Sequence, residues 1–353
     1  MHGVAPPELG SLAHGPIVGA LATISKHRAH QTPVRRILGR DPSTADVAQR
    51  MSTCAGRLAL AIELQDDTTA RALVEGGHFC QARLCPFCEW RRTRVWQRRL
   101  INGLAELHKE QPKLRPIFVT LTVRNVPVHR LRETIKEMHA AWNRYRRCAF
   151  FPSPYWLRRT EVTLGQPSFV DDLPRAPFLA GRPEVEVPGT GKRPTARPPV
   201  IGGLWAHPHI HALIMVRPRY FAADYVRHAQ WRDQWQMALR ADYSPVVDVR
   251  KATAKVGVSD PLAMSTAAAL EAAKYIAKST DIAALGDLAP EMHHQIRGLR
   301  MIGASDHLRN FIRTADITEA EMLDTSAVAA SNNPLFHCVA EWQELVQEYT
   351  IGA

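Results

Sequence analysis

Histidines alternate at the start of a strand-like segment that runs from His207 to Val216 and continues as an apolar run. Successive side chains of a β-strand point to opposite faces, so His209 and His211 share one face, about 6–7 Å apart along the chain. One metal ion can bridge that distance, although an isolated pair of this kind is also typical of partly buried sheet histidines. Pro208 cannot donate a backbone hydrogen bond, so we expect regular pairing to begin after it. That leaves His207 at the mouth of the strand, as a less suitable ligand.

The chain carries a net charge of +11, with 45 lysines and arginines against 34 acidic residues in 353. This excess favours a polyanionic partner, first of all nucleic acid, although a merely basic protein would show the same balance. No run of about 18 apolar residues occurs, which argues against a transmembrane helix and a membrane partner. The N-terminus lacks the apolar core of a signal peptide, so we expect a cytoplasmic protein.

Four cysteines between positions 54 and 88 have the spacing of a metal knuckle. Cys85 and Cys88 form a C-x-x-C pair that can bind one tetrahedral Zn²⁺, and Cys80 and Cys54 can complete four thiolates. His78 is an alternative fourth ligand. A redox C-x-x-C is the competing interpretation, but that motif normally opens a helix behind a strand, without an extra cysteine before it. The sequence therefore predicts structural zinc rather than disulfides.

An arginine-rich segment follows the cysteines directly. Trp96, Leu100, Leu104 and Leu107 recur at helical spacing, which leaves arginines on the other faces of the predicted helix. Such a helix, packed on a zinc knuckle, suits contact with DNA phosphates, and a solvated charged face is the alternative. The arginines predicted to bind DNA here are Arg91, Arg92, Arg94, Arg98 and Arg99.

Strand and helix patterns alternate from residue 117 to residue 279. Strands are predicted at 117–123, 158–164, 207–216 and 246–250, and helices at 131–145, 225–239 and 261–279. Strand, helix, strand, strand, helix, strand is the order of the split βαβ, or ferredoxin-like, unit, here with one added helix. We therefore predict an α+β fold on an antiparallel sheet whose second and third strands are neighbours.

That pairing would bring a carboxylate to the histidine pair. Glu161 on the second strand would lie beside His209 and His211 on the third, and we refer to these three residues as the metal triad. Two imidazoles and a carboxylate with open positions are typical of a catalytic metal site. Nitrogen and oxygen ligands suit Mn²⁺ or Mg²⁺, and imidazole tilts the preference toward Mn²⁺. A non-haem iron oxygenase uses the same ligand types and is an alternative.

The alanine-rich helix predicted at 261–279 carries a second group of candidates. Glu271 and Tyr275 are one turn apart and share a face, and Lys274 and Lys278 lie close to the tyrosine in sequence. An exposed charged face with one packed tyrosine is the simpler interpretation. The functional interpretation is a nucleophilic phenol, flanked by the carboxylate and by ammonium groups that favour its ionised form and bind phosphate.

Three motifs in this order resemble those of the rolling-circle plasmid replication initiators, the single-tyrosine members of the HUH endonuclease superfamily. Residues 118–125 are similar to the first motif of that family, and Glu161 with residues 207–211 to its metal-binding motif. Residues 271–278 are similar to its nucleophile motif, including the acid four residues before the tyrosine. The cysteine cluster also matches, so the resemblance extends from about residue 54 to residue 281.

The resemblance implies a nicking reaction and its participants. Metal in the triad would polarise a phosphate of single-stranded origin DNA, and Tyr275 would attack it, keeping the 5′-phosphate and freeing a 3′-hydroxyl primer. Glu271 would then activate water for the terminating cleavage, while Lys274 and Lys278 offset the charge on phosphate and phenolate. Arg124 of the first motif is a further expected DNA contact, and host helicase and polymerase are expected partners.

The resemblance and the composition divide the chain into four regions. We predict a disordered basic leader over residues 1–45, and the zinc knuckle with its basic helix over 46–112. The HUH endonuclease domain is predicted over 113–282, interrupted by a proline-rich insertion at 166–203 that is longer than the resemblance leads us to expect. A helical region is predicted over 283–353.

Two other functions use parts of the same residues. A single-tyrosine transposase or conjugative relaxase would have the same site and chemistry. A non-catalytic, zinc-dependent DNA-binding repressor would need the cysteines and arginines but not the metal triad. Only an endonuclease of this kind would leave the protein covalently attached to single-stranded DNA.

Overall fold

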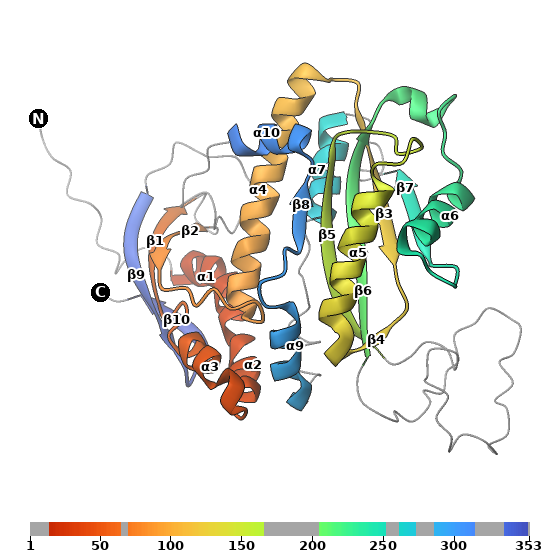
Figure 1. Cartoon of the computed structure of the whole chain (residues 1–353). Helices are drawn as coiled ribbons and strands as arrows, with labels where there is room; N and C mark the ends of the chain where they lie inside the picture. Colours follow the sequence, from red (N-terminus) through yellow and green to blue (C-terminus); the bar gives the residue numbers. More distant parts are fainter. Residues whose placement is uncertain are drawn as a thin grey trace, which may run out of the picture.

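The computed structural model describes residues 14–64, 70–165, 205–251, 261–272, 286–314 and 335–351 (Figure 1). They form two antiparallel sheets packed with helices, so the predicted α+β class is confirmed. The larger sheet has the order β7-β3-β6-β5-β8, with β4 paired to β6, and the smaller has the order β10-β9-β1-β2. None of the helices in these ranges is long and apolar enough to span a membrane.

The larger sheet is built around β6 (Trp205–Val216), which carries the histidines. β6 pairs with β3 on one side and with β5 on the other, and both pairings are antiparallel. The other strands of this sheet are β3 (Arg115–Thr122), β4 (Val126–Pro127), β5 (Trp156–Gly165), β7 (Val247–Lys251) and β8 (Ile302–Ala304). The second and third predicted strands, β5 and β6, are therefore neighbours.

The expectation that pairing in β6 begins after Pro208 is wrong, because the pairing with β5 begins at Trp205. On the opposite side of β6, β3 ends where Thr122 faces His209, and β4 begins where Val126 faces Ala206. Position 208 lies in the gap between these two pairings. The missing N–H of a proline costs little at a position where no strand pairs on that side.

Helices cover both faces of the larger sheet, and the alternation along β6 decides which residues each face receives. Ile210 and Ile214 belong to the aromatic core under α5 (Leu131–Tyr145) and α6 (His228–Leu239). Leu213 and Met215 pack on the opposite face, against α4 (Pro86–Glu110) and α10 (Asp306–Thr314). Because side chains alternate along a strand, His209 and His211 face the same side as Leu213.

Helix α7 (Pro261–Ala272) lies on the same face of the sheet as the histidines. It packs against α4 and against strands β3, β6 and β5. A hydrogen bond between His108 Nε2 of α4 and Ser265 Oγ of α7 (2.8 Å) fixes the two helices to each other. The second half of the predicted helix, 273–279, lies outside the described residues.

The prediction of a helical C-terminal region is wrong in part. Residues 286–314 do contain helices, η6 (Gly286–Leu288), α9 (Ala289–Ile296) and α10, but also β8 of the larger sheet. The hairpin β9 (Leu335–Gln343) and β10 (Glu348–Ile351) extends the smaller sheet by pairing with β1 (Arg57–Leu64), whose other neighbour is β2 (Ala70–Gly77). The C-terminal residues thus complete a sheet that begins near the N-terminus.

The predicted disordered leader is also wrong for the residues from 14 onward. They form α1 (His14–Ala29), α2 (Gln31–Leu38) and the short η1 (Pro42–Thr44), followed by α3 (Ala45–Ser52). Leu21, Ile24, Val34 and Leu38 are buried in the core that also contains the four cysteines. Apolar residues at helical spacing on α1 and α2 therefore outweigh the basic composition that suggested disorder.

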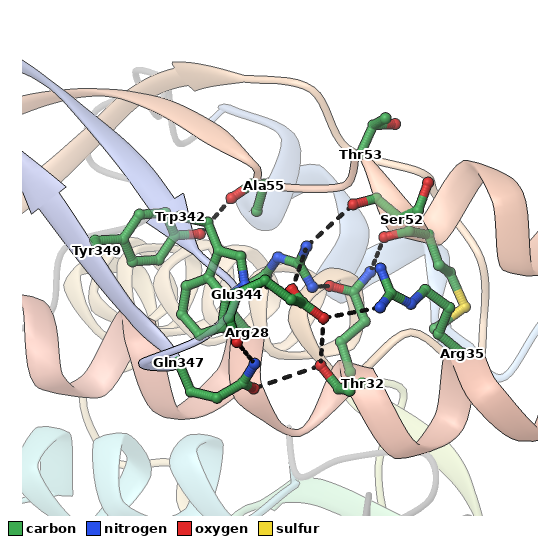
Figure 2. A network of polar contacts seen from close by, with 12 residues as sticks. Arg28, Thr32, Arg35, Ser52, Thr53, Ala55, Trp342, Glu344, Gln347 and Tyr349 are labelled. Atoms are coloured by element: carbon green, nitrogen blue, oxygen red, sulfur yellow. Dashed lines mark hydrogen bonds and ion pairs between the residues drawn. The ribbon is translucent and has the colours of Figure 1, made fainter.

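A buried arginine joins the two ends of the chain (Figure 2). Arg28 of α1 is 2% exposed, and its guanidinium donates to Gln31 Oε1 (2.7 Å) and to the carbonyl of Ser52 (3.0 Å). The same group lies over the Trp342 ring at 5.1 Å and 3.9 Å from the Glu344 carboxylate, both near the β9–β10 turn. These contacts hold the C-terminal hairpin against the N-terminal helices.

The predicted region boundaries do not separate independent cores. The core around the cysteines includes Leu131 of α5 and Val162 of β5, which belong to the predicted endonuclease region. Two short helices, η2 (Val128–Arg130) and η5 (Pro218–Phe221), complete the described elements. The proline-rich insertion lies outside the described residues.

Candidate functional site

The metal triad comes together on the face of the larger sheet that α4 and α7 cover. Glu161 of β5 is the direct cross-strand partner of His209 on β6. The Glu161 carboxylate lies 3.2 Å from His211 Nε2 and 3.8 Å from His209 Nε2. Glu161 and His209 are buried, at 6% and 8% exposure, and His211 is half-buried.

Contacts on the far side of each imidazole aim Nε2 at this point. His209 Nδ1 donates to the carbonyl of His207 (3.1 Å), and His211 Nδ1 lies 3.1 Å from Thr120 Oγ1 of β3. Since a carbonyl can only accept, the His209 proton resides on Nδ1 and its Nε2 presents a lone pair. Metal-binding histidines are commonly oriented by such a bond from the second ring nitrogen.

Electrostatics keep Glu161 and His209 in the protonation states that a cation needs. The pKa of His209 is lowered to about 4, chiefly by burial and next by the neighbouring His211, while Glu161 works in the opposite direction. Burial tends to raise the pKa of Glu161, but the hydrogen bond with His211 and the charges of His209 and Arg159 bring it below its usual value. A neutral imidazole and a charged carboxylate are the forms that bind metal.

The donor set and spacing of the triad fit a divalent cation. One carboxylate oxygen and two imidazole nitrogens lie within 4.8 Å of one another. Ligands about 2.1 Å from one metal ion are about 3.0 Å apart in an octahedron and about 3.4 Å apart in a tetrahedron. The separations given above are close to these values, so little movement is needed to close the site.

His207 shares the face of the triad but is engaged elsewhere. Its ring lies 5.2 Å from that of His209, and its Nδ1 contacts Asn125 Oδ1 in the connection between β3 and β4. It is not among the side chains whose ligand atoms converge within 4.8 Å. The geometry therefore groups Glu161 with the other two histidines and leaves His207 as a neighbour.

The four cysteine sulfurs also converge, at the start of α4. Cys54 follows α3, Cys80 follows β2, and Cys85 and Cys88 stand at the N-cap and in the first turn of α4. The Sγ–Sγ distances are 3.5 Å for Cys54–Cys88, 3.6 Å for Cys80–Cys88 and 3.8 Å for Cys54–Cys85. Zinc–sulfur bonds of about 2.3 Å in a tetrahedron place sulfurs about 3.8 Å apart, whereas a disulfide needs about 2.05 Å. His78, the alternative fourth ligand, is exposed and lies outside this group.

Cys85→Ser is expected to lower the free energy of unfolding by several kcal/mol, because the affinity of a closed zinc site for its metal is part of the folding energy. Urea unfolding measures this loss, and Cys148→Ser, which changes a half-buried cysteine outside the cluster, is the matched control. Elemental analysis of the fresh wild-type protein should find one zinc per chain. A protein without zinc would contradict the assignment.

A buried ion-pair chain connects the cysteine cluster to the triad. Glu89, next to Cys88, accepts from Arg159 Nη2 on β5 (2.8 Å) and from Arg92 Nη1 (2.8 Å). Arg159 is 1% exposed and is the cross-strand partner of His211, two residues from Glu161 along β5. Its Nε and Nη1 have no hydrogen-bond partner among the described residues. Glu89 is thus the hydrogen-bonded counter-charge of a cation buried beside the triad.

Glu89→Gln is expected to cost about 3–5 kcal/mol of stability, because it leaves Arg159 buried without a counter-charge. The double variant Glu89→Gln with Arg159→Met should regain most of that loss, since both charges are gone. Urea unfolding of the two single variants and the double variant measures the coupling. Glu106→Gln, which removes an exposed partner of Lys109 on the same helix, is the control. Additive losses would mean that the pair is not coupled.

The arginines of α4 have different surroundings. Arg92 donates to Glu89 and to the carbonyls of Gln81 and Ala82, so its guanidinium holds the loop between the cysteines. Arg91 stacks on the ring of Phe79 at 4.5 Å. Arg94, Arg98 and Arg99 are half-buried along the helix.

The remaining predicted residues are Arg124, between β3 and β4, and four residues in or after α7. Arg124 is exposed, stacks on Tyr243 at 4.1 Å, and lies 3.7 Å from Asp242. Glu271 is in the last turn of α7. Lys274, Tyr275 and Lys278 lie outside the described residues.

Comparison with known proteins identifies the family. The profile of a protein family described as "Replication protein" matches residues 71–350. A protein named "Protein rep" from Bacillus amyloliquefaciens is 27% identical over 86% of this chain and 84% of its own length. Another from a Bacillus species is 31% identical over 68% of this chain and 69% of its own length, and one from Streptococcus pneumoniae is 27% identical over 86% and 83%.

No solved structure matches the chain. The family match covers the larger sheet, the metal triad and the cysteine cluster from Cys80 onward. Of the smaller sheet it covers β9 and nearly all of β2 and β10, but not β1. The chain therefore belongs to the replication protein (Rep) family, in agreement with its resemblance to plasmid replication initiators.

Proposed function

We propose that the protein initiates rolling-circle replication of a plasmid by nicking single-stranded origin DNA with Tyr275. The observation that carries this proposal is the convergence of the metal triad on the sheet face that α7 covers. Tyr275 follows three residues after Ala272, the last described residue of that helix. Metal-assisted phosphoryl transfer uses a cation as Lewis acid beside the nucleophile, and the triad faces the helix after which Tyr275 follows in sequence.

The strand order supports assignment to the HUH endonuclease type. The four strands predicted from the sequence are β3, β5, β6 and β7 in chain order. In the sheet they lie in the order β7-β3-β6-β5. β6 thus lies between β3 and β5 and is antiparallel to both, with α5 connecting β3 to β5. This is the arrangement of a split βαβ unit, to which β8 adds an edge strand.

The chemistry follows from the groups present. A divalent cation held by the triad, Mn²⁺ or Mg²⁺, would supply Lewis-acid polarisation of the scissile phosphate. The Tyr275 phenol loses its proton to water, its oxygen bonds to phosphorus, and the bond from phosphorus to the 3′-oxygen breaks. The released 3′-oxygen takes up a proton and becomes the primer hydroxyl. Lys274 and Lys278 lower the cost of the charge on the phenolate and the phosphate.

Termination needs a second nucleophile, a water molecule, for the same phosphoryl transfer. Glu271, one turn before Tyr275, takes a proton from a water molecule that attacks the phosphorus of the regenerated origin. The bond from that phosphorus to the 3′-oxygen breaks, and the released oxygen takes up a proton. Zinc in the cysteine cluster would hold the start of α4 in place, and Arg94, Arg98 and Arg99 along that helix would contact DNA phosphates. Host helicase and polymerase would extend the primer.

Incubation of the protein with end-labelled single-stranded origin DNA and Mn²⁺ tests this function. The account predicts a product with a free 3′-hydroxyl that a polymerase extends, and a second product that protease treatment releases from protein. Chelation of the metal should stop the reaction, and Mn²⁺ should restore it. Binding without cleavage under these conditions would instead support a repressor.

A further inference from the structure

Three arginines gather on the face of the larger sheet opposite the metal triad. Arg158 of β5 lies beside Gly303 of β8, with guanidinium atoms 3.6–3.7 Å from where a glycine Cβ would stand. Arg146 at the C-cap of α5 and Arg300, just before β8, are close enough to lower the pKa of Arg158. We call Arg146, Arg158 and Arg300 the arginine cluster.

Within the described residues, the cluster carries positive charge without an acidic partner. Arg158 is 8% exposed, and the one hydrogen bond of its guanidinium among the described residues goes to Thr160 Oγ1 (3.4 Å). In the described part of the chain, none of the three guanidinium groups has a carboxylate within 4.0 Å. Burial lowers the pKa of Arg158 to about 10, with Arg300 and Arg146 adding to the effect, so it stays charged at neutral pH.

Structural reasons account for only part of this arrangement. Arg146 lies over the Trp156 ring at 5.3 Å and stands where a cation stabilises a helix C-terminus. Arg300 donates from Nε to the carbonyl of Ile302 (3.2 Å). Arg158 makes only the long contact to Thr160 among the described residues, and His139 Nε2 lies closer to the same hydroxyl, at 2.8 Å. A nearly buried cation beside two others is unfavourable unless an anion joins them.

Further basic groups extend the cluster along the same surface. Arg132 of α5 donates to the carbonyls of His294 and Arg297 at the end of α9, which fixes α5 to the segment before β8. Lys136, one turn further along α5, and Arg297 are exposed. These charges thus lie on α5 and on the segment between α9 and β8, which Arg132 joins.

We propose that the arginine cluster binds the phosphate backbone of duplex DNA that flanks the nick site. This rests on the proposed function only in taking origin DNA as the ligand. The triad faces the other side of the sheet. DNA cleaved there therefore reaches the cluster only after passing around β8, the edge of the sheet. β8 has three residues, and this edge is therefore short. Arg297 and Arg300, on the approach to β8, lie on that path.

The salt dependence of binding to a duplex of unrelated sequence tests the proposal. Arg146→Gln with Arg300→Gln should weaken binding and reduce the slope of log K against log salt concentration by about 0.9 for each phosphate that the protein no longer neutralises. Arg219→Gln, which removes an exposed arginine paired with Asp224, is the charge-matched control and should leave the slope near the wild-type value. Calorimetric titration with Mn²⁺ checks separately that the triad is intact, whether or not the protein nicks DNA.

Arg158→Met gives an independent readout with a distinctive sign. It should weaken duplex binding and also raise the melting temperature of the DNA-free protein, because it removes an uncompensated buried charge. A lower melting temperature together with an unchanged salt slope would overturn the proposal and make the cluster a structural feature. The proposal would also be overturned if inorganic phosphate stabilises the wild-type protein but all variants bind duplex DNA equally well.

Discussion

His209→Ala and His211→Ala are each expected to reduce metal-dependent nicking by at least about 10³-fold. The Lewis-acid contribution of one bound cation is worth several kcal/mol in the transition state, and each 1.36 kcal/mol is a factor of ten. Both side chains point Nε2 at the Glu161 carboxylate, so the loss of either leaves two ligands. Calorimetric titration with Mn²⁺ should show lost or much weaker binding in both variants.

Two further histidine variants show whether the effect is specific. His228→Ala removes an imidazole that contacts the carbonyl of Val247 on the far side of the sheet, and it should leave Mn²⁺ binding intact. His207→Ala should have an intermediate effect, because it removes the imidazole that contacts Asn125 but keeps the His207 carbonyl that orients His209. Unchanged Mn²⁺ binding in both His209→Ala and His211→Ala would remove the triad as the metal site.

Tyr275→Phe is expected to eliminate the covalent protein–DNA adduct, whereas Glu271→Ala should still form it. The unperturbed pKa of tyrosine is about 10, so the phenol needs cations and a polarised phosphate to act as a nucleophile at neutral pH. Phenylalanine keeps the ring but has no oxygen to attack. Glu271→Ala keeps the nucleophile but should not hydrolyse a second origin copy, so replication would run past termination.

Denaturing gels of both variants with labelled single-stranded origin DNA separate these roles. An adduct formed by Tyr275→Phe would mean that another residue attacks the phosphate. A normal second cleavage by Glu271→Ala would assign that carboxylate to the solvated face of its helix.

The triad could be predicted because its signals are local. The two-residue period of His209 and His211 needs only a strand, and Glu161 follows once the strand order makes β5 and β6 neighbours. The groups that orient the triad could not be predicted. Thr120 faces His211 from β3, and no pattern in residues 118–125 shows which hydroxyl reaches an imidazole.

The pairing of Glu89 with Arg159 depends on tertiary structure and crosses 70 positions of the chain. The sequence shows Arg159 on the strand face of Glu161, but an arginine beside a carboxylate usually suggests a surface ion pair. Its burial follows from α4 packing over β5. The arginine cluster was missed for the same reason, because Arg146, Arg158 and Arg300 come from three elements.

The smaller sheet was missed because its strands have no clear alternation of polar and apolar residues. In β1, Leu58, Leu60, Ala61 and Ile62 are all buried, so both faces of the strand are apolar. A short run of this kind does not separate a buried strand from a helix segment. Its partner β9 begins more than 270 positions later, at Leu335, and no local signal links the two.

Identification of the residue that becomes attached to DNA decides whether Tyr275 is the nucleophile. The wild-type protein is incubated with single-stranded origin DNA and Mn²⁺, digested with protease and nuclease, and the modified peptide is sequenced by mass spectrometry. The account predicts a nucleotide joined through its 5′-phosphate to Tyr275, in the peptide that follows α7. A nucleotide on any other residue, or cleavage without a protein-linked product, would contradict it.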